Sequence, residues 1–335
     1  MKGMILAAGF GTRLRPVTHT LPKPMVPLCN RPLIAWAVES LLAADVRELI
    51  VNLHHLPGPI EHYLLAQYSA KAKLHFSFEE QILGTGGAIR RVGSLLGRDQ
   101  AFFLVNGDTV QFPRWDALRD ALGDNLAALT LRHPPAHDRF TPVYLDAGRV
   151  TGFGSGSGEA LMFAGSHLIH SRIFRSLPDE EVFGIVDRVY QPLLAAGSET
   201  IAGVLDEGPL WFDIGTPQRY LSASKAMLES MLRGDLAVPE GSRVEGHSLV
   251  HDTTRGSATR SILGERTIIQ GDVRDSIVWD DCTIEGTIER CIVAHGVRVE
   301  GEHRDELITR DYGPTPLQIL SGWRAGGEGS MEPSR

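Results

Sequence analysis

The sequence predicts an α/β protein in which a doubly wound, mostly parallel (Rossmann-like) sheet is followed by a parallel β-helix. Three observations predict this fold class. Over residues 1–234, short apolar segments alternate with segments of helical period. A glycine-containing loop follows the first apolar segment directly. Beyond residue 234 the helical period disappears, and apolar residues recur six positions apart. Alternating strands and helices form parallel sheets covered on both faces, whereas a short fixed period is typical of stacked coils.

The first part has the strand and helix order of such a sheet. Apolar or alternating segments predict strands over residues 4–7, 48–53, 73–78 and 101–105, and helical periodicity predicts helices over residues 33–44, 60–68, 87–96, 185–196 and 217–232. Residues 125–165 are glycine-rich and strand-like, and we expect an antiparallel excursion that covers the sheet. Ligands of these sheets lie beyond the carboxyl ends of the strands, so the loops after Leu6 and Val105 are candidates for a site.

The second part carries the six-residue spacing. The pairs are Val244 and Val250, Ile262 and Ile268, Val278 and Ile284, and Val293 and Val299. A hexapeptide period is the mark of a parallel β-helix, and it fits better than an irregular β-sandwich. We therefore expect three regions: a catalytic domain over residues 1–234, a β-helix over 235–310, and a disordered tail over 311–335, where Gly, Pro, Ser and Glu dominate.

Composition excludes several classes of partner. The chain has 33 Lys and Arg against 41 Asp and Glu, a formal charge of −8, and no basic cluster, so nucleic acid is not an expected partner. No apolar stretch approaches the roughly 18 residues of a membrane span, and the N-terminal apolar run is too short for a signal peptide. Three scattered cysteines fit neither a disulfide framework nor a metal site. These features predict a cytoplasmic protein.

The glycine loop after the first strand has three interpretations. A dinucleotide-binding fingerprint needs a third glycine where Leu14 stands, and a Walker A loop needs Gly-Lys-Ser/Thr where Thr12 and Arg13 follow Gly11. Both fail. What is present is a pair of glycines that lets backbone amides approach a ligand, next to a fixed cation, and this combination suits an oxyanion.

The wider context of the loop is far more specific. The string Leu6-Ala7-Ala8-Gly9-Phe10-Gly11-Thr12-Arg13-Leu14-Arg15-Pro16 precedes Pro22-Lys23-Pro24-Met25-Val26-Pro27. Together they closely resemble the signature of the sugar-1-phosphate nucleotidyltransferases, a resemblance that covers residues 1 to about 230. The six-residue repeats resemble the left-handed β-helix that several members append.

The resemblance implies roles for these and later positions. Nucleotide binding falls to Leu6, Ala7, Ala8, Gly9, Gly11, Thr12 and Arg13, with Glu80, Gly84 and Thr85 from the segment Glu79-Glu80-Gln81-Ile82-Leu83-Gly84-Thr85. Arg13 and Lys23 become the catalytic cations, which neutralise the reacting phosphates. Asp108, in Asn106-Gly107-Asp108, and Asp213, in Trp211-Phe212-Asp213-Ile214-Gly215-Thr216-Pro217, become ligands of Mg²⁺. Taken alone, either aspartate could instead cap a helix.

The resemblance also implies that Asn106, Gly107, Phe163 and Gly165 contact the sugar. Here the sequence departs from the family. Residues 152–161 contain no counterpart of the Glu-Lys-Pro whose lysine grips the sugar phosphate, and Pro142 replaces a glycine that faces the sugar. The identity of the sugar is therefore open.

The expected reaction joins a nucleoside triphosphate to a sugar 1-phosphate and releases pyrophosphate. A carboxylate at Glu79 or Glu80 favours guanine, which presents two adjacent donors, so GTP is the first choice of nucleotide. Mannose 1-phosphate is the first choice of sugar phosphate because the chain resembles the mannose-1-phosphate guanylyltransferase-like members of the family. UTP or dTTP with glucose 1-phosphate or N-acetylmuramate 1-phosphate is the second. A non-catalytic subunit that senses nucleotide sugars is the alternative of another class. Because the β-helix has exposed coil edges and flat faces, we expect a homo-oligomer.

Overall fold

The computed structural model describes residues 1–97, 100–135 and 140–317, and these residues divide into two compact units. The sheet unit comprises Met1–Phe10, Thr20–Pro27 and Arg31–Asp213. The coil unit comprises Gly11–His19, Leu28–Asn30 and the described residues from Ile214 onward. The last long helix thus groups with the C-terminal strands in this division. The domain boundary at residue 234 stays a prediction.

The sheet unit is built on one mixed sheet, which has nine strands among the described residues. Its order is β5 (Lys73–Phe78), β4 (Glu48–Leu53), β1 (Lys2–Leu6), β6 (Ala101–Asn106), β11 (Glu159–His170), β8 (Ala127–Arg132), β12 (Ile201–Leu205), β10 (Arg149–Phe153) and β9 (Val143–Asp146). Strand β1 pairs in parallel with β4 and β6, and β4 with β5. These first four strands have the Rossmann-like arrangement that the sequence predicts.

The second half of the sheet differs from the prediction. Strand β11 runs antiparallel to both β6 and β8, and β10 runs antiparallel to β12 and β9. The prediction of a mostly parallel sheet is therefore wrong beyond β6. The antiparallel pairing predicted within residues 125–165 is confirmed by β9, β10 and the start of β11, but these strands extend the sheet instead of covering it. A strand buried on both faces has the same continuous apolar sequence at any position in a sheet, so the sequence does not reveal its place in the strand order.

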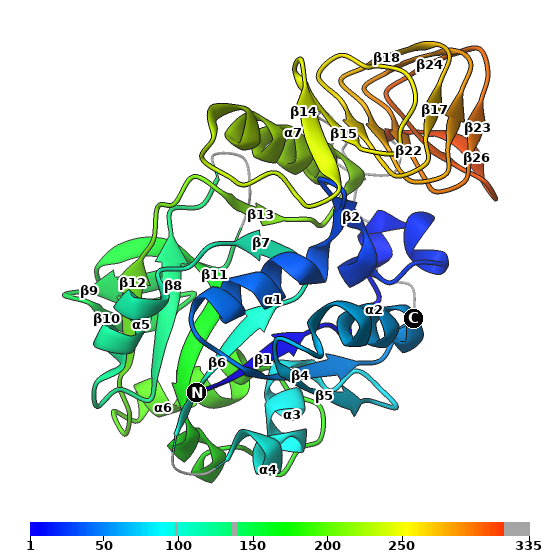
Figure 1. The fold of residues 1–335 in the computed structure, drawn as a ribbon. Helices are drawn as coiled ribbons and strands as arrows, with labels where there is room; N and C mark the ends of the chain where they lie inside the picture. The colour runs from blue at the N-terminus through cyan, green and yellow to red at the C-terminus, as the bar shows by residue number, and fades with distance from the viewer. Residues whose placement is uncertain (98–99, 136–139, 318–335) are drawn as a thin grey trace, which may run out of the picture. The chain divides into compact units, whose positions relative to one another are not determined.

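Helices cover both faces of the sheet (Figure 1). They are α1 (Leu33–Ala43), α2 (Pro57–Tyr68), α3 (Gly84–Arg91), α4 (Gly93–Leu96), α5 (Trp115–Leu122) and α6 (Gln191–Ala195). Alternate strand residues face opposite layers, so Ile5 packs with α1, α2 and α5, whereas Met4 packs with α3. Shorter turns complete the unit: η3 (Lys23–Met25), η4 (Ser171–Arg175) and the π-helical η5 (Val186–Tyr190). Two-residue strands β2 (Pro27–Leu28) and β3 (Arg31–Pro32) precede α1.

The coil unit has one long helix and a stack of short strands. The helix α7 (Pro217–Arg233) begins at Thr216, whose hydroxyl accepts a hydrogen bond from the Arg219 amide. The turns η1 (Thr12–Leu14) and η2 (Val17–His19) belong to the same unit. The strands are β14 (Ser242–Glu245), β15 (Ser248–His251), β16 (Ile262–Leu263), β17 (Ile268–Ile269), β18 (Asp272–Arg274), β19 (Ile277–Val278), β20 (Thr283–Ile284), β21 (Thr287–Glu289), β22 (Ile292–Val293), β23 (Arg298–Val299), β24 (Glu302–Arg304), β25 (Glu306–Thr309) and β26 (Gly313–Pro316).

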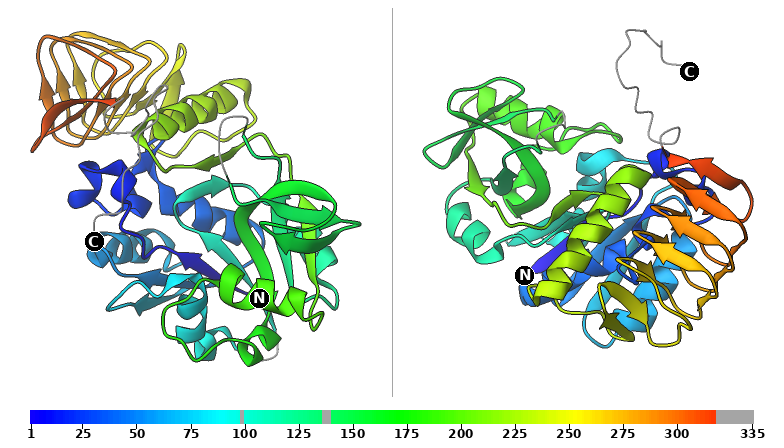
Figure 2. Two further views of the ribbon diagram at one scale, coloured as in Figure 1. Left: turned by 180° about the vertical axis from the view of Figure 1, so that it is seen from behind. Right: turned by 90° about the horizontal axis from the view of Figure 1, so that it is seen from above.

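Most of these strands form three parallel ladders, which the chain visits in rotation (Figure 2). Ile262 pairs with Ile277, and Ile277 with Ile292, so successive coils are 15 residues apart. The inward side chains of one coil, Val278, Ile284 and Ile288, are spaced by six and then four residues. The six-residue period is therefore correct for one side of the coil and wrong for the other two. The handedness of the coil stays a prediction.

Both ends of this stack also differ from the prediction. Val244 lies on β14, which pairs with β15 as an antiparallel hairpin and not as a coil, whereas Val250 on β15 pairs in parallel with Leu263 and belongs to the core of the stack. At the other end, residues 313–316 form β26, which pairs with β25, and Leu317 is buried. The expectation of disorder is thus wrong for residues 311–317, because β26 covers the last coil edge; the rest of the predicted tail lies outside the described residues. No helix among the described residues is long and apolar enough to cross a membrane.

Candidate functional site

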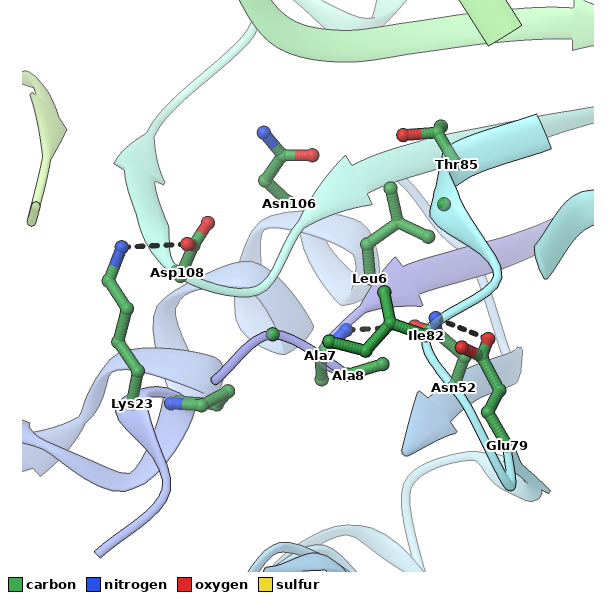
Figure 3. Close-up of a pocket in the computed structure, with 13 residues that line it drawn as sticks. Leu6, Ala7, Ala8, Lys23, Asn52, Glu79, Ile82, Thr85, Asn106 and Asp108 are labelled. Atoms are coloured by element: carbon green, nitrogen blue, oxygen red, sulfur yellow. Dashed lines mark hydrogen bonds and ion pairs between the residues drawn. The ribbon is translucent and has the colours of Figure 1, made fainter. Parts of the chain in front are cut away.

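A pocket of about 240 Å³ lies at the carboxyl ends of β1, β4 and β6 (Figure 3). It is lined by Leu6, Ala7, Ala8, Gly9, Lys23, Pro24, Asn52, Glu79, Ile82, Gly84, Thr85, Asn106 and Asp108. The two loops that the sequence singled out, after Leu6 and after Val105, both contribute to it. Because the parallel strands end at one edge of the sheet, residues separated by up to a hundred positions meet there.

A chain of hydrogen bonds fixes the start of the glycine loop. The Ala7 amide donates to Asn52 Oδ1 at 2.8 Å, and Asn52 Nδ2 donates to Glu79 Oε1 at 2.8 Å. The other carboxylate oxygen of Glu79 accepts from the Leu83 amide at 3.1 Å. Asn52 and Glu79 are both buried, so this chain holds the glycine loop and the Glu79–Thr85 segment at a set separation across the pocket.

The structure distinguishes Glu79 from Glu80. Glu79 is 5% exposed and lines the pocket, whereas Glu80 is exposed and is not among the lining residues. Glu80, the nucleotide-binding carboxylate predicted from the sequence, therefore does not line the pocket, whereas Glu79 does. Strand β5 ends at Phe78, so the alternation of buried and exposed side chains along the strand could not be used to tell Glu79 from Glu80.

Gly84 and Thr85, predicted from the same segment, both line the pocket. Gly84 has a φ of +71°, and a Cβ there would lie 2.7 Å from the Phe183 carbonyl oxygen. The first turn of α3 is pressed against this backbone, where Gly86 donates to the same carbonyl at 3.0 Å. The glycines of the motif thus seat the start of α3 beside the pocket, which explains why the helix begins at Gly84 and not at the predicted residue 87.

Of the two aspartates predicted as metal ligands, Asp108 directly precedes one strand and Asp213 ends its neighbour. Strands β7 (Thr109–Gln111) and β13 (Trp211–Asp213) are antiparallel, and their register sets Asp213 opposite Thr109, next to Asp108. Lys23 Nζ lies 2.7 Å from Asp108 Oδ2 and 3.8 Å from Asp213 Oδ1. Lys23 is 5% exposed, so this ammonium is held in a buried position between two carboxylates.

Neither aspartate caps a helix. Asp108 is followed by strand β7, and α7 is capped by the Thr216 hydroxyl without help from Asp213. The alternative interpretation of both residues as helix caps is therefore wrong. Oxygen donors of this kind are the ligands that Mg²⁺ prefers, commonly one or two carboxylates completed by phosphate and water. The described residues contain no group of three or more His, Cys, Asp or Glu side chains placed to hold a metal.

The remaining loop residues belong to the coil unit. Gly11 adopts a φ of 62°, and its carbonyl accepts from the Thr18 hydroxyl at 2.9 Å and from the Leu14 amide at 2.9 Å. The Arg13 guanidinium lies directly over Gly215, where a Cβ would be 2.7 Å from Nη1. Gly11, Thr12 and Arg13 are not among the lining residues of the pocket. Two motifs about 200 residues apart in the sequence thus meet at Arg13 and Gly215.

The predicted sugar-binding residues divide into two groups. Asn106 lines the pocket. Gly107, Phe163 and Gly165 do not, although Gly107 donates its amide to the Leu6 carbonyl at 2.8 Å and so joins the two strand ends. Gly165, at a φ of +93°, faces the Asn106 amide, from which a Cβ would be 2.8 Å away. Phe163 packs edge-on against the His167 ring in the core.

Four lining residues are absent from the sequence-based site prediction: Pro24, Asn52, Glu79 and Ile82. Asn52 is a polar residue inside an otherwise apolar strand, and its burial is the feature that could have marked it.

Comparison with known proteins agrees with this geometry. The family described as nucleotidyl transferase matches residues 2–130. A mannose-1-phosphate guanyltransferase of Hypocrea jecorina is 29% identical over 256 residues, which are 70% of this chain and 66% of that protein. Mannose-1-phosphate guanylyltransferase 1 of Arabidopsis thaliana is 28% identical over 314 residues, 90% of this chain and 83% of that protein. The solved structure of HddC from Yersinia pseudotuberculosis shares the fold, with a TM-score of 0.57 and 23% identity over 68% of this chain and 99% of that one.

Residues 2–130 thus match the nucleotidyl transferase family, and most of the chain is similar to mannose-1-phosphate guanylyltransferases. The chain is accordingly a transferase of nucleotide-sugar biosynthesis, which moves a nucleotidyl group onto a sugar 1-phosphate.

Proposed function

We propose that the chain converts GTP and mannose 1-phosphate into GDP-mannose and pyrophosphate. The single observation that carries the proposal is the buried Lys23 ammonium between the partly exposed carboxylates of Asp108 and Asp213, beside the glycine loop. The choice of GTP and mannose is supported by the names of the relatives that cover up to 90% of the chain.

The chemistry needs no general base. The nucleophile is a phosphate oxygen that is already ionised at neutral pH, and it attacks the α-phosphorus of the triphosphate as pyrophosphate leaves. Catalysis then consists of positioning and of neutralising charge. Ala8 and Gly9 line the pocket, where their backbone amides would suit phosphate oxygens, and Lys23 supplies a cation in the same pocket. We assign Arg13 to the departing pyrophosphate.

We assign Asp108 and Asp213 as the residues that would hold Mg²⁺. The fit is chemical: two carboxylates face one buried ammonium, so the site is already arranged for a positive charge shared between them. When bound, the ion would neutralise charge on the reacting phosphates. In that state Lys23 can turn from the carboxylates toward a phosphate oxygen without leaving the pocket that it lines.

We assign base recognition to the Glu79 side of the pocket. Each oxygen of Glu79 accepts one hydrogen bond from the protein, and a carboxylate has acceptor sites for more. Guanine presents an N–H and an exocyclic NH₂ side by side, which suits this acceptor. Ile82, Gly84 and Thr85 line the same side, so an apolar wall and backbone groups are available to the base.

We propose further that the C-terminal stack is a left-handed β-helix that mediates homo-oligomer formation. It is supported by three parallel ladders in rotation and by a last coil that β26 covers, which leaves the sides of the stack for association.

The test is pyrophosphate release with four nucleoside triphosphates against a panel of hexose 1-phosphates, each with Mg²⁺ and with chelator. We expect turnover with GTP and mannose 1-phosphate that chelator abolishes. Preference for UTP or dTTP with another sugar phosphate would keep the reaction and overturn the substrates. No pyrophosphate release with any pair of substrates, together with binding of a nucleotide sugar, would instead support a sensing subunit.

A further inference from the structure

Gln111 is a buried amide whose hydrogen-bonding groups are both unused. It ends strand β7, is 7% exposed, and neither its Oε1 nor its Nε2 has a partner in the structure. A buried amide normally has partners, because leaving it without them after removal from water costs free energy. An unpaired amide beside a substrate pocket therefore points to a ligand that supplies the missing partners.

The surroundings of Gln111 belong to the substrate side of the sheet unit. A Cβ built on Gly165 would lie 2.8 Å from Asn106 Nδ2 and 3.7 Å from Gln111 Nε2, so the two amides face the same point on the Gly165 backbone. Asn106 lines the pocket, two residues before Asp108 (Figure 3). Gln111 therefore lies just behind the pocket wall at Asn106.

Trp211 forms another wall of this space. It is directly opposite Gln111 in the pairing of β13 with β7, so the two side chains lie on the same face of that two-stranded sheet. The Trp211 indole donates to the Ala164 carbonyl at 2.8 Å, which fixes the backbone next to Gly165. The Arg132 guanidinium lies 5.5 Å over the Trp211 ring, and its Nε also lacks a partner.

The side-chain amides of Gln111 and Asn106 are neutral and can both donate and accept hydrogen bonds, whereas Lys23, Glu79 and Asp108 give the pocket charged groups. An amide offers one acceptor and two donors, and each sugar hydroxyl both donates and accepts. Phosphates are matched by Lys23 and by backbone amides, which lie elsewhere in the pocket. A hexose ring, with its hydroxyls against amides and its carbon face near an aromatic ring, is the ligand whose groups fit.

We propose that Gln111 determines sugar specificity by exchanging hydrogen bonds with hydroxyls of the bound hexose 1-phosphate. This inference rests on the proposed function, since it needs a sugar phosphate in the pocket. This contact does not replace the Glu-Lys-Pro lysine that the chain lacks, because that lysine binds the sugar phosphate, whereas Gln111 would bind the sugar hydroxyls.

The test replaces Gln111 by methionine, which keeps the length of the side chain and removes both polar groups. We expect kcat/KM for mannose 1-phosphate to fall about 10- to 100-fold, with the KM for GTP unchanged and the Tm unchanged or raised, since an unpaired buried amide has been removed. Among monodeoxy analogues of mannose 1-phosphate, the wild type should reject one by a similar factor. The Gln111→Met variant should lose that discrimination, while Gln111→Asn should keep part of it.

Ser230→Ala is the matched control, because Ser230 on α7 is also buried with an unpaired hydroxyl. Its kinetic constants should equal those of the wild type. Equal kcat/KM for mannose 1-phosphate in the wild type and in Gln111→Met would overturn the role of Gln111 and leave the proposed function intact. Calorimetry with mannose 1-phosphate alone tests binding when there is no turnover. If the wild type binds this ligand without turnover and Gln111→Met binds it more weakly, the proposed reaction is overturned and the sugar contact is supported. If the wild type neither binds nor converts any sugar phosphate, both proposals fail together.

Discussion

The pocket edge and the corners of the coil both pair a basic side chain with aspartate, but for different ends. At the pocket, Lys23 lies 2.7 Å from Asp108 and 3.8 Å from Asp213 and is almost wholly buried. At one coil corner, Arg260, Asp275, Arg290 and Asp305 stand 15 residues apart, so that each arginine meets the aspartate of the next coil. The Arg260 side chain is 53% exposed.

The difference lies in the solvent around the charges. Around the buried Lys23 ammonium water screens less, so this cation and the two partly exposed carboxylates constrain which charged ligand can enter. In the exposed ladder, water screens each pair, and its contribution to stability is small. We assign no catalytic role to the corner arginines. Because arginine and aspartate alternate from coil to coil, each arginine can pair with the aspartate of the next coil. Four predictions test this contrast, from the largest expected effect to the smallest.

Asp108→Asn should lower kcat about 10³-fold or more, because it removes the charge that faces both Lys23 and the proposed metal. The Tm should change little, since Asp108 is only partly buried and its strand β7 does not depend on it. Steady-state pyrophosphate release and a thermal melt measure the two quantities. Asp275→Asn at the coil corner is the matched control and should leave kcat unchanged. A fully active Asp108→Asn enzyme would remove Asp108 from the catalytic group.

Glu79→Gln should lower kcat/KM for GTP about 10²-fold and change the order of preference among the four triphosphates. The amide that replaces the carboxylate would present a donor to Asn52 or to the Leu83 amide, and so break the chain that ends at Ala7. Glu80→Gln is the control next to it in the sequence and should change selectivity less than twofold, because Glu80 is exposed. The opposite result, a shift with Glu80 and none with Glu79, would return base recognition to Glu80.

His167 shows what burial does to a titratable group that has no catalytic part. Its Nδ1 lies 3.1 Å from the Tyr190 hydroxyl, and burial lowers the pKa of His167 to about 3. Because the folded pKa lies below the ordinary value of 6.5, the neutral ring stabilises the fold fully above about pH 6.5. That stability is lost as the pH falls from 6.5 toward 3, with a slope of about 1.4 kcal/mol per pH unit for one proton.

The measurement is urea unfolding between pH 4 and pH 7. His167→Gln, which can still accept from Tyr190, should reduce the acid slope by about one proton. His133→Gln should act in the opposite sense, because hydrogen bonds to Glu159 and Glu207 raise the pKa of that exposed histidine, so its contribution is present at low pH and is lost as the pH rises. An unchanged acid slope in His167→Gln would show that other groups dominate acid unfolding.

The smallest effect is expected at the coil corner. The double variant Arg260→Met, Arg290→Met should shift the Tm by no more than about 2 °C, because both guanidinium groups are exposed. Inside the same coils, Ile288→Ala should cost roughly 2–5 kcal/mol, because it opens a cavity in a fully buried stack. Differential scanning calorimetry compares the two. A larger loss from the arginines than from Ile288 would show that the ladder, and not the apolar interior, holds the coils together.

A site residue could be predicted from the sequence when it belongs to a short motif, and could not when its role depends on distant neighbours. Short motifs with recognisable spacing contain the glycine loop, Lys23, Asn106 and Asp108. The structure brings most of these residues to one pocket. Asn52 and Gln111 carry no such motif. Their importance arises from burial and from neighbours such as Glu79 and Gly165, which are distant in the sequence.

By itself, the sequence determined the parallel core of the sheet, the edge at which ligands lie and the class of reaction. These follow from local periodicity and from motifs, which a single chain segment can specify. Only the tertiary structure decided the place of β11 between β6 and β8, the unequal spacing of inward residues within one coil, and the choice of Glu79 over Glu80 as the carboxylate that faces the pocket. Each of these depends on which segment is packed against which, because apolar strands and acidic residues look alike in the sequence until their neighbours are known.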